Sequence, residues 1–113
     1  MKTSELTGPA LDWAVAKCEG ITYFGAPQGR TEAMEFLLMH PDDPDLQFST
    51  NWSQGGPIIE REGVSIKWVT ADEWMAVGLD NAVTFGPTPL IAAMRCYVAS
   101  ELGDEVDIPE ILR

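Results

Sequence analysis

The hydrophobic pattern of the chain contains two helix-like segments, one near each end. Residues 10–18 follow Pro9, residues 90–102 follow Pro89, and a glycine closes each segment. Proline suits the first helical turn because its missing N–H would have no partner there, and glycine accepts the left-handed conformation that ends many helices. The pattern therefore predicts a helix over each segment, with Thr88 as the N-cap of the second.

Weaker helical signals occupy the middle of the chain. Residues 31–39 combine a threonine cap, early acidic residues and an apolar end, and Pro41 stops them, which predicts a short helix. Residues 51–62 predict another helix, with Asn51 as its N-cap. We expect this helix to loosen at a glycine pair and to restart at Pro57.

Alternation with a period of two marks a small sheet between these helices. In residues 64–69, Val64, Ile66 and Trp68 alternate with polar side chains, and residues 74–79 place Met75, Val77 and Leu79 on one face. An Asp-Asn pair follows Leu79 and suits a two-residue turn, because both residues tolerate positive φ. Residues 82–85 are then the returning strand of an antiparallel meander.

Together these elements predict one α+β domain over residues 1–113. A three-stranded sheet is stable only when helices cover part of it, so we expect a layered α/β/α sandwich with the small antiparallel meander packed between helices.

The charge balance excludes several classes of partner. The 113 residues carry 7 Lys and Arg against 18 Asp and Glu, which gives a formal net charge of −11. Clustered Lys and Arg supply most of the affinity for nucleic acid and for anionic lipid, so neither a nucleic-acid nor a membrane partner is expected.

Cysteine and histidine usage argues against a metal centre. The chain has 2 Cys and 1 His, fewer than the roughly four ligands of structural zinc. The sequence also lacks the basic start and apolar run of a signal peptide, which predicts a reducing cytoplasm with Cys18 and Cys96 as free thiols. No cofactor motif is present, so no cofactor is expected.

Three stretches of the sequence closely resemble the NinX-like proteins of tailed bacteriophages. They are residues 4–17, residues 51–63, which include Asn-Trp-Ser-Gln-Gly-Gly-Pro, and residues 86–100, which begin with Gly-Pro-Thr-Pro-Leu. The second half also resembles phage α-β-α sandwich domains, whereas residues 21–49 match no family pattern. The resemblance implies a phage or prophage origin, action in the cytoplasm of an infected bacterial host, and a layered fold. It implies no catalytic residues, because the activity of the family is unknown.

Arg95 is the most informative candidate residue. At about 100° per residue, Arg95 lies within about 40° of Ile91, inside the apolar stripe of the final helix. In one interpretation, its stem packs against neighbours while the guanidinium reaches the helix edge or pairs with an acid of the first helix, such as Asp12. In the other, Arg95 lines a pocket or a subunit interface, and its planar fork receives a carboxylate or a phosphate.

A polar segment and a helix start supply the other candidate ligand-binding residues. Asn51, Trp52 and Gln54 offer an aromatic face and amide groups beside two glycines that allow close approach. The alternative is a capped helix start with Trp52 in the core. Thr88 lies at a helix N-terminus, which attracts anions, although a stiff turn between two prolines explains the same residues.

The sequence lacks a nucleophile–base pair, a metal-ligand set and a cofactor motif, so we expect a non-enzymatic phage accessory protein that acts by binding. One hypothesis is counter-defence, in which Arg95 and the polar segment sequester a small anionic, nucleotide-derived ligand. The alternative is an acidic protein–protein inhibitor that occupies a basic groove of a host enzyme, using residues 42–45 and 101–110. The final helix is apolar nearly all round, with Leu90 and Tyr97 outside its main stripe, so a homo-oligomer is also expected.

Overall fold

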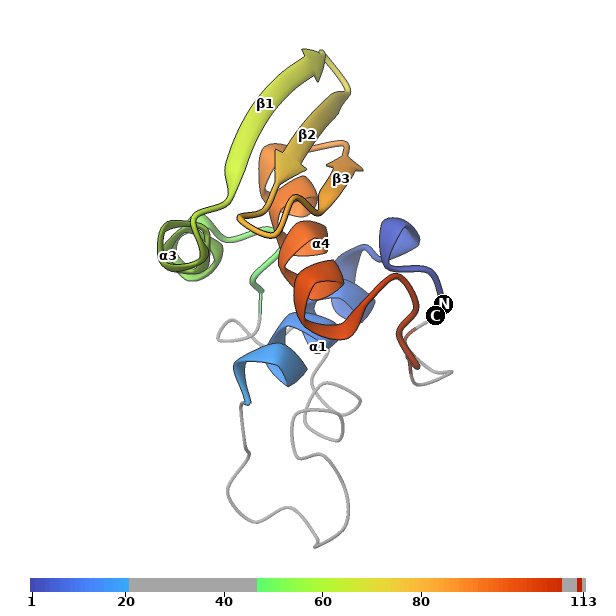
Figure 1. Ribbon diagram of the computed structural model, residues 1–113. Coiled ribbons are helices and arrows are strands. Elements are labelled where there is room, and N and C mark those ends of the chain that lie inside the picture. The colour runs from blue at the N-terminus through green and yellow to red at the C-terminus, as the bar shows by residue number, and fades with distance from the viewer. Residues whose placement is uncertain (21–46, 109–111, 113) are drawn as a thin grey trace, which may run out of the picture.

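The computed structural model describes residues 1–20, 47–108 and 112 (Figure 1). The helix expected at 31–39 and the acidic loop 42–45 lie outside these residues. The described elements in chain order are the 3-10 helix η1 (Thr3–Glu5), α1 (Gly8–Glu19), α3 (Trp52–Glu62), β1 (Ser65–Thr70), β2 (Glu73–Val77), β3 (Val83–Gly86) and α4 (Pro89–Leu102).

Helix α4 lies at the centre of the fold. The three strands pack along one side of it, and α1, α3 and η1 contact its other sides (Figure 1). Because its neighbours surround it, residues on several faces of α4 are buried at once. They are Leu90, Ile91, Ala92, Ala93, Met94, Cys96, Tyr97 and Val98.

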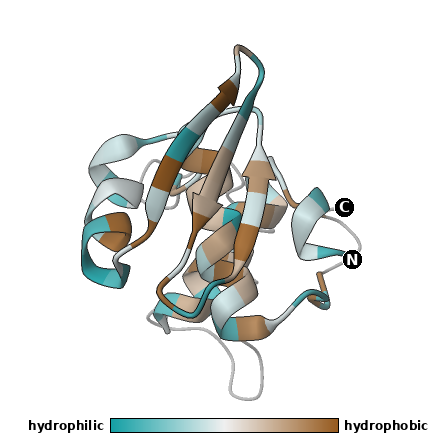
Figure 2. Ribbon diagram, turned by 45° about the horizontal axis from the view of Figure 1, so that its top comes forward, coloured by the Kyte–Doolittle hydropathy of each residue, from teal (hydrophilic) through white to brown (hydrophobic). Residues whose placement is uncertain are grey.

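The sheet is an antiparallel meander in the order β1-β2-β3, and its two faces differ. Ala76 and Thr84 are paired in the register and buried toward α4, where the Thr84 hydroxyl donates a 2.8 Å hydrogen bond to the Ala92 carbonyl. Val83 and Phe85 point to the opposite face and are 51% and 44% exposed. Figure 2 shows strongly hydrophobic and paler positions alternating along β3, as the period of two of a strand requires.

The predicted α+β class, with a three-stranded antiparallel meander packed against helices, is confirmed. Among the described residues the layers run from the sheet through α4 to α1, so α4 occupies the middle. The predicted punctuation is also confirmed: Gly20 ends α1 in the left-handed conformation, and the Thr88 hydroxyl accepts the amide of Ile91 at the start of α4.

Two predicted boundaries are wrong for local reasons. Helix α3 neither loosens nor restarts, because the residue before Pro57 is a glycine without the Cβ that the proline ring would crowd. The second strand stops at Val77, because the amide of Gly78 bonds the Ala82 carbonyl at 2.9 Å and closes a turn. Leu79 therefore lies in that turn and is 81% exposed.

The expectation of a homo-oligomer loses its structural support. It was based on apolar residues around the whole of α4, yet Leu90 is 2% exposed and Tyr97 is 5% exposed within the chain itself. The sheet, α1, α3 and η1 together cover the helix, so no second copy is needed to cover it. The oligomer itself stays a prediction.

Close packing of α3 against α4 predicts unequal effects at two adjacent glycines. A Cβ at Gly55 would lie 2.5 Å from Leu90 Cδ1 and 2.6 Å from the Phe48 carbonyl oxygen, whereas a Cβ at Gly56 would meet nothing beyond its chain neighbours closer than 4.0 Å. We expect Gly55→Ala to lower the free energy of unfolding by about 2 kcal/mol through overpacking. Gly56→Ala should lower it by less than about 1 kcal/mol, because the new Cβ meets only the ring of the neighbouring Pro57 and the helix preference of alanine offsets part of that crowding. Urea unfolding measures both, and equal stabilities of the two variants would contradict this packing.

Candidate functional site

Arg95 extends from α4 to the junction of η1 and the sheet. Its Nε donates to the Leu6 carbonyl at 2.7 Å, and its Nη1 donates to the Phe85 carbonyl at 2.8 Å. Burial lowers the pKa of the guanidinium from its ordinary value, but an arginine stays protonated in proteins. Two of its five N–H groups thus hold it in place, and the other three have no partner in the part of the chain that the structure describes, so they can bind a ligand.

Asp12, the acid considered as a partner for Arg95, lies elsewhere. It is 5% exposed on α1, and its Oδ1 accepts the backbone amide of Ser49 at 2.8 Å. Burial raises the pKa of the Asp12 carboxyl. The interpretation in which Arg95 pairs with Asp12 is therefore wrong: backbone carbonyls hold the guanidinium instead.

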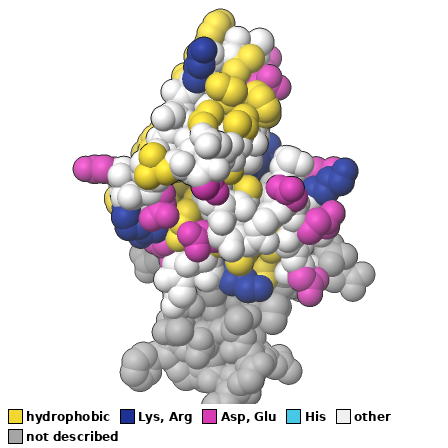
Figure 3. All heavy atoms as spheres, viewed as in Figure 1, with side chains coloured by type: hydrophobic (Ala, Val, Ile, Leu, Met, Phe, Trp, Pro, Cys, Tyr) yellow, Lys and Arg dark blue, Asp and Glu magenta, His cyan; other side chains and the backbone are white. Residues whose placement is uncertain are grey.

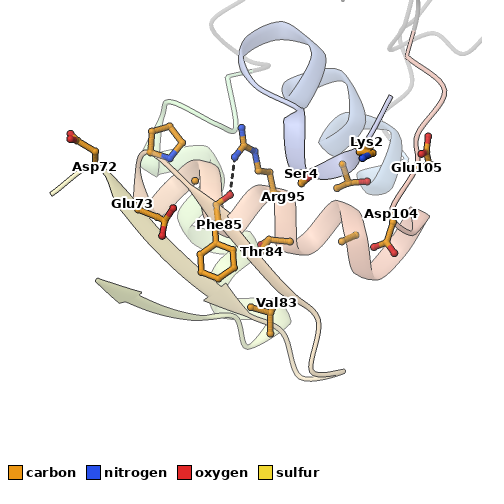
Figure 4. A pocket seen from close by; sticks show the side chains of 14 residues that line it. Lys2, Ser4, Asp72, Glu73, Val83, Thr84, Phe85, Arg95, Asp104 and Glu105 are labelled. Carbon is orange, nitrogen blue, oxygen red and sulfur yellow. Dashed lines mark hydrogen bonds between the residues drawn. The ribbon is translucent and has the colours of Figure 1, made fainter. Parts of the chain in front are cut away.

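Arg95 lines a cavity of about 490 Å³ between β3, η1 and the segment after α4. Figure 4 shows Arg95 near its middle, with Asp72 and Glu73 to one side and Asp104 and Glu105 to the other. Lys2 and Arg95 are the cations among the lining residues, against these four acids. The cavity can therefore accept one anionic group at Arg95, surrounded by carboxylates that favour donors or cations.

The other predicted binding residues are not gathered around Arg95. Asn51 caps α3 by accepting the Ser53 amide at 3.0 Å, and the Gln54 Oε1 accepts the Gln47 amide at 2.8 Å. Trp52 is 52% exposed, so its expected place in the core is also wrong. Trp52 and Thr88 line a separate cavity of about 200 Å³. The composite site of Arg95 with Asn51, Trp52 and Gln54 is not formed by the described residues.

Sequence reasoning missed the other residues around Arg95. Lys2, Glu73 and Glu105 line its cavity, although they come from three distant parts of the chain. Their residue types are ordinary for exposed positions, so no local pattern marked them. The signal that did exist was the arginine itself, a charged side chain at a position where the helix was expected to be apolar.

A second polar cluster joins the end of α1 to α3 and α4. Arg61 donates to both carboxylate oxygens of Glu19, at 3.1 and 2.6 Å, and the Tyr97 hydroxyl donates to Glu19 Oε2 at 2.6 Å. The guanidinium also lies 5.6 Å from the centre of the Tyr97 ring. All the polar groups of the cluster bind one another, so it fastens three helices together.

Both cysteines lie where burial raises the pKa of the thiol and so disfavours a reactive thiolate. Cys18 and Cys96 are free thiols, as predicted, and burial raises the pKa of Cys18 to about 12. Within residues 1–20, 47–108 and 112 no three metal-ligating side chains converge on one point. None of the helices described here is long and apolar enough to cross a membrane.

The Glu19–Arg61 contact predicts a pH-dependent contribution to stability. Hydrogen bonds from Arg61 lower the pKa of Glu19 below its ordinary value of 4.5. The stabilisation is therefore complete above that value and is lost as the pH falls through the folded-state pKa. Because Arg61 is 50% exposed and screened by solvent, Arg61→Gln should cost about 1 kcal/mol at pH 7.

The cost of Arg61→Gln should shrink in urea unfolding series that descend below pH 4.5. Lys67→Gln on the exposed part of β1 removes the same charge and is the matched control, with little effect at either pH. A cost for Arg61→Gln that does not change with pH would show that Glu19 does not gain from the contact.

The family of the chain follows from comparison with known proteins. The model of the family described as Bacteriophage P22, NinX matches residues 2–101, which include η1, the sheet and nearly all of α4. No curated protein matches the chain. The match covers far more than half of the 113 residues, including most positions that line the Arg95 cavity. The chain therefore belongs to the bacteriophage NinX family, whose function is unknown.

Proposed function

We propose that this NinX-family protein acts by binding and not by catalysis, and that Arg95 receives one anionic group of the bound partner. The observation that carries the proposal is the position of Arg95: two backbone carbonyls hold it in the wall of a cavity of about 490 Å³. A guanidinium already held in place loses little conformational entropy on binding. Its planar fork matches the geometry of a carboxylate or a phosphate.

The first candidate partner is a small nucleotide-derived ligand, which a phage protein would sequester to counter a host defence in the infected cell. The cavity volume falls within the roughly 300–1,000 Å³ of small-molecule sites. Its four acidic lining residues favour a ligand with one anionic group next to hydrogen-bond donors, such as a nucleobase amino group, over a ligand with several phosphates.

The second candidate is protein–protein inhibition, in which an acidic surface occupies a basic groove of a host enzyme. The observation in its favour is that Asp104 and Glu105 are exposed directly beside the cavity, so acids and Arg95 would meet the same partner. Association between such surfaces is fast at low salt and slows as salt screens the charges.

A ligand screen tests the first candidate. Thermal unfolding and native mass spectrometry are run with nucleotides and cyclic dinucleotides. A ligand at about 100 times its Kd stabilises the folded state by about 2.7 kcal/mol, which raises the Tm of a domain of this size by roughly 10 °C. Failure of every nucleotide to raise the Tm or to remain bound would overturn sequestration.

Matched arginine variants identify the site. Arg95→Gln should abolish the ligand-induced rise in Tm, whereas Arg61→Gln, which removes the same charge beside a different cavity, should keep it. Asp104→Asn with Glu105→Gln keeps hydrogen-bond acceptors in the cavity while removing two charges, so it should weaken capture of a basic host protein more than it weakens binding of the small ligand. A full Tm rise in folded Arg95→Gln would exclude Arg95 as the anion-binding residue.

A further inference from the structure

Along the outer edge of β3, the Val83 N–H and C=O and the Phe85 N–H have no hydrogen-bond partner among the described residues. In an antiparallel ladder, alternate residues direct both their N–H and their C=O toward the same neighbouring strand. The Ala82 carbonyl accepts the Gly78 amide on the β2 side, so residues 82, 84 and 86 face β2. The Phe85 carbonyl instead accepts Arg95, as the dashed line in Figure 4 shows. Val83 and Phe85 therefore direct their backbone groups outward.

The cavity that contains Arg95 runs along this edge. Residues 83–87 form one wall, and Lys2–Ser4 with Asp104 and Glu105 form the opposite wall. Since these two walls bound a cavity of only about 490 Å³, a single extended segment fits the space beside β3 better than the edge of a second folded sheet does.

The surroundings specify what such a segment must carry. Arg95 lies at the Phe85 end of the edge, where it can receive a carboxylate. The exposed side chains of Val83 and Phe85 lie on the outer face of the sheet, next to alternate side chains of any added strand. Figure 3 shows apolar side chains gathered over the sheet region, in contrast to the mixed charges over the helices. Asp72, Glu73, Asp104 and Glu105 flank the cavity and match basic residues.

We propose, on the basis of the proposed function of Arg95 as an anion receptor, that the occupant is an extended peptide segment of a partner protein. The segment adds to β3 as a fourth strand and bonds the Val83 N–H and C=O and the Phe85 N–H. Its carboxylate binds Arg95, an apolar residue next to it packs on Val83 and Phe85, and its basic residues face the acids that flank the cavity. Main-chain bonds supply affinity in this mode, and side-chain positions supply specificity.

Amide hydrogen exchange tests strand addition directly. The probe is a synthetic heptapeptide of alternating valine and threonine, with a central glutamate and a lysine at each end. When the peptide is bound, the outward amides of Val83 and Phe85 should exchange at least about tenfold more slowly, because each amide then donates a hydrogen bond to the peptide backbone. The outward amide of Trp68, on the opposite sheet edge, is the internal control, since no residue of β1 lines the Arg95 cavity.

Two matched changes separate the backbone contact from the charge contact. A peptide with glutamine in place of glutamate should bind about tenfold more weakly, because a charge-assisted bond to Arg95 is lost. Val83→Pro removes an outward N–H without touching the β2 ladder and should weaken binding about fivefold. A peptide N-methylated along its backbone tests the same bonds without changing the protein and should not bind measurably.

The outcomes distinguish this inference from the proposed function. If the peptide shifts the Arg95 Nε–H resonance but leaves exchange at Val83 and Phe85 unchanged, strand addition is overturned and Arg95 remains an anion receptor. If the peptide affects neither while a nucleotide shifts the Arg95 resonance, the peptide class is overturned and the small-ligand form of the proposed function stands. If neither class of probe shifts it, both proposals fail.

Discussion

One constraint organises this protein: α4 carries apolar side chains on several of its faces, and each of those faces must be covered. A sheet alone covers one side of such a helix, so the fold needs α1, α3 and η1 as well, drawn from both halves of the sequence. Arg95 belongs to α4, so the packing that buries its neighbours also fixes where its side chain leaves the helix. The guanidinium lies between η1 and β3, where it bonds the Leu6 and Phe85 carbonyls. The position of the candidate site is thus a consequence of how the central helix is enclosed.

The local signals of the sequence predicted the local structure well. The prolines and glycines that delimit α1 and α4, the Asn51 cap and the alternation in the strands each depend on neighbouring residues only. The Arg95 site depends on contacts with Leu6 and Phe85, which are 89 and 10 residues away, and no pattern in one sequence encodes a partner at the first of these separations. The same limit explains why a homo-oligomer was inferred from a helix that the chain itself covers.

The large negative charge of the protein also has a more local meaning in the structure. Some acids of the described residues pair closely with cations, as Glu19 does with Arg61. Others lie to either side of Arg95, as Figure 4 shows, and make no hydrogen bond to it. A cavity lined by two cations, Lys2 and Arg95, and four carboxylates discriminates against polyanions and accepts a partner with charges of both signs. The net negative charge therefore determines which partners the cavity accepts more than how strongly the protein attracts them.

The two edges of the sheet also bear on how the protein avoids associating with itself. An exposed strand edge is a common starting point for uncontrolled aggregation, and charged side chains, prolines and bulges limit that risk. On β1 the register shifts between Trp68 and Thr70, which interrupts a regular ladder. On β3 Arg95 covers the Phe85 carbonyl, and Pro87 follows without an N–H to offer. Arg95, which we assign to recognition, thus also limits edge-to-edge strand pairing between molecules of this protein.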